Sequence, residues 1–133
     1  DALRTAGFSH LDSADRVRLT DVEIHRFWYP VGSSGLSLKL ELIEGRLPFH
    51  QQVLARRVEV PAFGSTILVA SREDLILLKL IAGPPIDRVD ALELVRLHRD
   101  RLDHAYLDSA AAGLGQAQEW DDLKAAAAGP DAS

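Results

Sequence analysis

Lys79 has the clearest chemical requirement in this sequence, because it stands in a helical pattern that is otherwise apolar. Residues 75–82 contain only leucine, isoleucine and alanine around that single lysine. Burying an ammonium group without a partner is costly in free energy. Lys79 therefore needs a carboxylate partner, a route to the surface, or an anionic ligand. The sequence alone leaves these alternatives open.

Two aspartates that follow Lys79 offer it a partner. Asp87 and Asp90 lie one helical turn apart near the start of a second predicted helix, residues 86–98. On a shared face they would stabilise the positive end of the helix dipole. The functional alternative is that they orient Lys79. We expect the first role and keep the second as a hypothesis.

Glu41 is the other candidate for chemistry, and it lies in a strand pattern over residues 36–43. Leucine occupies every even position from 36 to 42, so Ser37, Lys39 and Glu41 project together from the opposite face. A carboxylate in this position is either an ordinary solvated side chain or one that faces a cleft.

Several common kinds of site are not encoded. The chain has no cysteine, which excludes disulfides, thiolate catalysis and cysteine-ligated metal centres. Its five histidines have no zinc-like spacing, and there is no P-loop or glycine-rich dinucleotide fingerprint. A net charge of −5 gives no overall attraction to nucleic acid or anionic lipid. No apolar run approaches the roughly 20 residues that span a bilayer. We expect a cytoplasmic protein without a membrane partner, and nucleic-acid binding stays open.

The elements that must position these residues are strands followed by helices. We expect a first helix that ends at Gly7 and a short strand at 17–19. Residues 32–35, Gly-Ser-Ser-Gly, suit the turn of an antiparallel hairpin, and Ser71 suits a helix N-cap. The predicted strands are 22–29, 36–43, 58–61 and 66–70, and the predicted helices are 48–57, 72–82, 86–98, 103–114 and 116–127.

This pattern predicts an α/β (α+β) fold, with a mixed sheet of about four to five strands and a helical C-terminal third. We expect one domain over residues 1–128 and a flexible tail at 129–133. The chain contains no methionine, so we also expect that upstream sequence is absent.

Three blocks of the sequence resemble one protein family. They are residues 38–43 (LKLELI), 48–56 (PFHQQVLAR) and 69–83 (VASREDLILLKLIAG), followed by Asp87 and Asp90. In this order they are similar to bacterial nucleotidyltransferase-fold proteins related to the AbiEii-type toxins of toxin–antitoxin systems. The resemblance covers roughly residues 36 to 107, and its most specific part is the block that contains Lys79.

The resemblance implies Mg²⁺-dependent transfer of a nucleoside monophosphate from a nucleoside triphosphate to an acceptor. In that family an aspartate pair follows a glycine-serine turn, and a third carboxylate on a neighbouring strand helps to hold Mg²⁺. Glu41 matches this third position as catalytic and metal-binding residue, and Lys79, Asp87 and Asp90 match the nucleotide site. No carboxylate pair follows Gly32, so we interpret its turn as a simple hairpin turn and expect the pair upstream.

Two functions follow from the resemblance. The first is an active nucleotidyltransferase that binds Mg²⁺ and a nucleoside triphosphate. The second is a catalytically inactive interaction or oligomerisation module, with a protein partner or a second copy of the chain. The second is motivated by the missing aspartate pair, by glutamate at position 41, and by Pro84 where relatives often have arginine.

Overall fold

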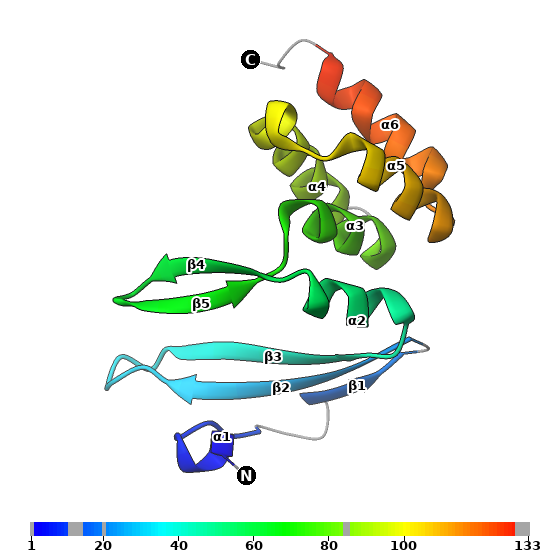
Figure 1. The fold of residues 1–133 in the computed structure, drawn as a ribbon. Helices are drawn as coiled ribbons and strands as arrows, with labels where there is room; N and C mark the ends of the chain where they lie inside the picture. Colours follow the sequence, from blue (N-terminus) through cyan, green and yellow to red (C-terminus); the bar gives the residue numbers. More distant parts are fainter. Residues whose placement is uncertain (1, 11–14, 20, 84–85, 130–133) are drawn as a thin grey trace. The chain divides into compact units, whose positions relative to one another are not determined.

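The computed structural model describes residues 2–10, 15–19, 21–83 and 86–129, and its elements follow one another as in Figure 1. Its internal contacts divide the chain into two compact units, Asp1–Gln52 and Val53–Ser133. The single domain over residues 1–128 stays a prediction. Most of the predicted tail lies outside the described residues.

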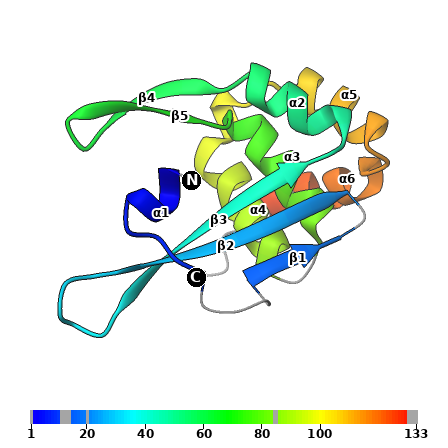
Figure 2. The same cartoon turned by 90° about the horizontal axis from the view of Figure 1, so that it is seen from below.

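The first unit contains a three-stranded antiparallel sheet in the order β1-β2-β3 (Figure 2). A short helix, α1 (Ala2–Thr5), precedes β1 (Arg16–Arg18), β2 (Val22–Pro30) and β3 (Ser37–Gly45). β-Branched and aromatic residues favour the β2 strand. The β2–β3 hairpin is closed by Val31, whose amide donates to the carbonyl of Leu36 at 2.9 Å, so the predicted hairpin is confirmed.

The register of this sheet determines which side chains share a face. Arg26 lies opposite Glu41, and Glu23 lies opposite Glu44. Because successive side chains of a strand point to opposite faces, these two pairs lie on different faces of the sheet. The aromatic rings of Phe8 and His10 contact Tyr29 and Phe27, which share the face of Glu23.

Helix α2 (Pro48–Ala55) follows β3 and ends two residues before the predicted position. At this end the guanidinium of Arg57 donates to the carbonyl of Leu54 at 2.5 Å. A basic side chain near a helix C-terminus can satisfy one of the last carbonyls in this way.

The second unit begins with a two-stranded antiparallel sheet, formed by β4 (Val58–Ala62) and β5 (Ser65–Val69). Phe63 and Gly64 connect the strands with φ angles of 54° and 72°, as in tight hairpin turns with two left-handed residues. The predicted α+β class and strand number are confirmed, but the described strands form two antiparallel sheets where we expected one mixed sheet. Each pairing joins neighbours in sequence, and short connections impose antiparallel pairing.

Helices form the rest of the second unit. They are α3 (Arg72–Ala82), α4 (Ile86–His98), the 3₁₀ turn η2 (Arg99–Arg101), α5 (His104–Gly113) and α6 (Ala117–Ala128). Ser71 caps α3, since its hydroxyl accepts from the amide of Asp74 at 3.1 Å. None of the helices in the described part of the chain has the length and apolar character needed to cross a bilayer. The buried apolar residues of these helices include Ile76, Leu77, Val95, Leu107, Trp120 and Leu123.

Candidate functional site

Lys79 is paired with both downstream aspartates. Its Nζ donates to Asp87 Oδ1 at 2.8 Å and to Asp90 Oδ2 at 2.7 Å. These hydrogen bonds, first from Asp87 and then from Asp90, raise the pKa of Lys79 above its ordinary value. Asp87 also lies in the first turn of α4. The structure therefore brings the three predicted residues together, while their role in nucleotide binding stays a prediction.

A shallow hollow of about 730 Å³ lies beside Lys79 on helices α3 and α4. Two basic and two acidic side chains line it, so it offers a triphosphate no excess of positive charge. Asp90 in this lining, like Asp87 outside it, already accepts a hydrogen bond from the ammonium of Lys79. The lining residues are Leu75, Lys79, Asp90, Glu93, Leu94, Arg96 and Leu97.

Glu41 is held by two basic side chains of its own unit. Arg26 Nε donates to Glu41 Oε1 at 2.8 Å, and Lys39 Nζ lies 3.4 Å from the same oxygen. The Arg26 hydrogen bond, opposed by partial burial and assisted by Lys39, holds the pKa of Glu41 below its ordinary value. Glu41 is ionised at neutral pH, but two cations already balance its charge.

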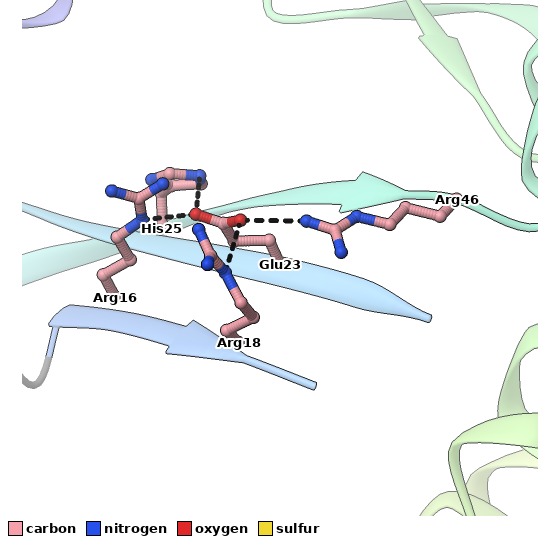
Figure 3. A network of polar contacts seen from close by, with 5 residues as sticks. All are labelled: Arg16, Arg18, Glu23, His25 and Arg46. Atoms are coloured by element: carbon pink, nitrogen blue, oxygen red, sulfur yellow. Dashed lines mark hydrogen bonds and ion pairs between the residues drawn. The ribbon is translucent and has the colours of Figure 1, made fainter. Parts of the chain in front are cut away.

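A second polar cluster, which the sequence did not predict, surrounds Glu23 (Figure 3). Arg16 Nε contacts one carboxylate oxygen, and Arg18 Nε and Arg46 Nη2 donate to the other at 3.2 and 3.1 Å. His25 Nε2 lies 3.4 Å from the first oxygen. We name these five residues the Glu23 cluster.

The arginine contacts explain the ionisation of Glu23. The hydrogen bond from Arg16 lowers the pKa of its carboxyl group, burial opposes this, and Arg18 lowers it further. The alternation of Arg16 and Arg18 in a short strand was the available signal in the sequence. Their common partner depends on the strand register, which that alternation does not specify.

Glu23, His25 and Glu44 also have ligand atoms within 4.8 Å of one another, the spacing of a metal site. Three guanidinium groups contact Glu23 and would repel a divalent cation at this carboxylate. Mg²⁺ also prefers several free oxygen ligands, whereas this group contains an imidazole. Glu41 is not part of the group. The described residues therefore do not fit the Mg²⁺ site that the resemblance implies.

A third network lies in the second unit around the fully buried carboxylate of Asp74. Tyr106 donates its hydroxyl to Asp74 Oδ1 at 2.5 Å, and Arg56 Nε donates to Oδ2 at 3.1 Å. The Arg56 guanidinium also lies 3.8 Å from the centre of the Tyr106 ring. Burial first, and then the hydrogen bond to Asp74, raise the pKa of Tyr106 to about 12. This network joins α3 to α5 and is best explained as structural.

No protein-family model, no curated protein and no solved structure matches this chain. The resemblance to nucleotidyltransferase-fold proteins therefore depends on the sequence blocks around Glu41 and Lys79 alone.

Proposed function

We propose that this chain is a nucleotidyltransferase-like protein that acts as an interaction module and does not itself transfer nucleotides. The observation that carries this proposal is the pairing of Glu41 with Arg26 and Lys39. A carboxylate that helps to activate a nucleotide must bind Mg²⁺ together with other carboxylates. In the described part of the chain, Glu41 is instead balanced by cations.

The surface that this module would use is the β3 strand. β3 lies at the end of the strand order β1-β2-β3, and an edge strand has backbone groups that can pair with another chain. Leu38 and Leu42 of β3 are 58% and 45% exposed, although they share one face of the sheet. An edge strand with exposed leucines suits association with a second copy of this chain.

The oligomeric state tests this use of β3. We expect light scattering across a range of concentrations to show self-association, because contact between two copies would remove the leucines from water. Leu38→Glu should shift the protein toward the monomer. Leu97→Glu is the matched control, since Leu97 is an exposed leucine of α4. A wild-type chain that stays monomeric at high concentration would count against a homodimer.

A calorimetric titration with Mg²⁺ and nucleoside triphosphates tests the absence of catalysis. We expect no Mg²⁺-dependent binding. Incubation with labelled nucleoside triphosphates should transfer no label to the protein itself. Tight binding that required Mg²⁺ and was lost in Glu41→Ala would reject the interaction-module proposal.

Nucleotidyl transfer is the second candidate, and one observation favours it. Glu41 is ionised and its side chain is 32% exposed, so Mg²⁺ could reach it if it displaced Arg26. Under this alternative, Arg26→Gln should strengthen Mg²⁺ binding by releasing the carboxylate. Unchanged Mg²⁺ binding in Arg26→Gln would argue against it.

A further inference from the structure

We propose that Arg16, Arg18 and Arg46 form a binding site for a phosphate group of a small molecule. Glu23 is the positioning residue that holds the three guanidinium groups together. All members of the site belong to the first unit. This inference goes beyond the interaction-module function and does not depend on it.

The register of the sheet places the arginines around one point. Arg16 and Arg18 are two positions apart on β1 and therefore share a face, where they lie opposite His25 and Glu23. Arg46 approaches from beyond the end of β3, and Figure 3 shows it on the side of the Glu23 carboxylate opposite Arg16. Three arginines from two separate segments thus converge on one carboxylate.

The position of Arg46 is fixed by its backbone. Its amide donates to the carbonyl of Asp21 at 2.9 Å, which continues the pairing beyond β2 and β3. The preceding residue is Gly45, and a β-carbon there would collide with the ring of His50. Glycine at position 45 therefore leaves room for the ring of His50 beside the end of β3, next to the backbone of Arg46.

Burial is distributed unequally between the carboxylate and the arginines. The Glu23 side chain is 3% exposed, whereas those of Arg16, Arg18 and Arg46 are 59%, 65% and 46% exposed. Each arginine contacts Glu23 through one nitrogen. The remaining guanidinium nitrogens can therefore donate to a ligand from solvent.

The charges of the cluster favour an anion over a metal ion. Three guanidinium groups contact Glu23, and positive charge exceeds negative charge even when Glu44, which lies opposite Glu23, is included. Guanidinium groups match the oxygens of phosphate in geometry as well as in charge. A tetrahedral anion with several oxygens can bind more than one of these arginines at once.

Isothermal titration with inorganic pyrophosphate, without Mg²⁺ and at low ionic strength, tests the site. We expect the wild-type chain to bind and the affinity to fall with added salt. Arg18→Gln and Arg46→Gln should each weaken binding about tenfold or more, because a charge-assisted contact is lost. Arg18→Lys keeps the charge without the planar fork, and its affinity should lie between those of wild type and Arg18→Gln. Inorganic phosphate, titrated in parallel, should bind more weakly than pyrophosphate.

Arg26→Gln is the matched control, because Arg26 also binds a carboxylate of this sheet but on its other face. Its affinity for pyrophosphate should stay near that of wild type. The inference is overturned if wild type does not bind, or if Arg26→Gln loses as much affinity as Arg18→Gln. Binding of Mg²⁺ or Zn²⁺ alone that Glu23→Gln abolishes would also overturn it. Far-UV circular dichroism should confirm that each variant is folded.

Discussion

Glu41 and Glu44 both belong to β3, yet their side chains lie on opposite faces of the sheet. Glu41 is opposite Arg26, and Glu44 is opposite Glu23. They are separated by an odd number of positions, and a strand alternates its side chains with a period of two. The two carboxylates therefore belong to different sites. The residue that the resemblance identifies as a metal ligand does not share a face with the Glu23 cluster.

The pair of Arg26 and Glu41 should contribute little to stability. Both side chains are about one third exposed, and such ion pairs are typically worth up to about 1 kcal/mol. A double-mutant cycle with Arg26→Gln and Glu41→Gln, measured by urea unfolding, should give a coupling free energy in this range. A coupling of several kcal/mol would mean that Glu41 has a buried structural role.

Acid should destabilise the protein through carboxylates whose pKa values are depressed. Glu23, Glu41 and Asp108 have lowered pKa values because of hydrogen bonds, first from Arg16, Arg26 and Lys124 respectively. Such groups stabilise the folded state above their unfolded pKa values, and this contribution is lost as pH falls through the folded values.

The free energy of unfolding should therefore decrease as pH falls below the ordinary glutamate value of 4.5. Measurement of urea midpoints across this range checks the expectation. Glu41→Gln should weaken the dependence of the urea midpoint on pH. A pH dependence identical to that of wild type would show that Glu41 does not contribute to the loss of stability in acid.

Lys79→Met should destabilise the second unit modestly. It leaves Asp87 and Asp90 one turn apart on α4 without their shared cation, and repulsion between them adds to the lost pairing. We expect a loss of about 1 kcal/mol, because all three side chains are partly exposed.

Lys39→Met is the control for Lys79→Met, since Lys39 makes a longer contact of 3.4 Å, to Glu41.

The raised pKa of Lys79 also predicts how stability depends on pH. The contribution of Lys79 to the free energy of unfolding is complete below the ordinary lysine pKa of 10.5, and it is lost as pH rises through the raised pKa of the folded state. Equal urea midpoints for wild type and Lys79→Met at neutral pH would contradict the prediction.

Asp74→Asn should be the most destabilising of these substitutions. Asp74 is fully buried and accepts from Tyr106 and Arg56, so its loss leaves Arg56 without its carboxylate. Because Arg56 is 38% exposed and can be solvated, we expect a loss of about 2 kcal/mol, which is typical of hydrogen bonds to a charged group. Tyr106→Phe removes one hydrogen bond and should cost about 1 kcal/mol. Thermal unfolding monitored by calorimetry can rank the two.

The phenol of Tyr106 provides a spectroscopic test of the same network. With a folded pKa of about 12, it should ionise above the ordinary tyrosine value of 10.0 in an ultraviolet titration. Stability should accordingly fall as pH rises from 10.0 toward about 12, because the unfolded state releases the proton first. In Asp74→Asn the pKa of Tyr106 should move back toward 10.0. A Tyr106 that ionises normally in wild type would contradict the Asp74 contact.

The local pattern of side chains by itself determined most of the helices and strands. The bounds of α3 and α4 are those predicted, and the N-cap at Ser71 is confirmed. The carboxylate partners of Lys79 were also predicted as one alternative. These features depend on helical periodicity and on contacts between residues close in sequence, which the order of side chains already contains.

Tertiary structure alone decided the rest. The division of the strands into two sheets and the convergence of Arg16, Arg18 and Arg46 on Glu23 depend on which strands pair and in which register. Asp74 and Tyr106 are 32 positions apart and meet only because α3 and α5 pack together. A slip of one residue in the register would move Glu23 to the other face of the sheet. Composition and periodicity do not specify that register, so the arginine cluster could be found only in the folded chain.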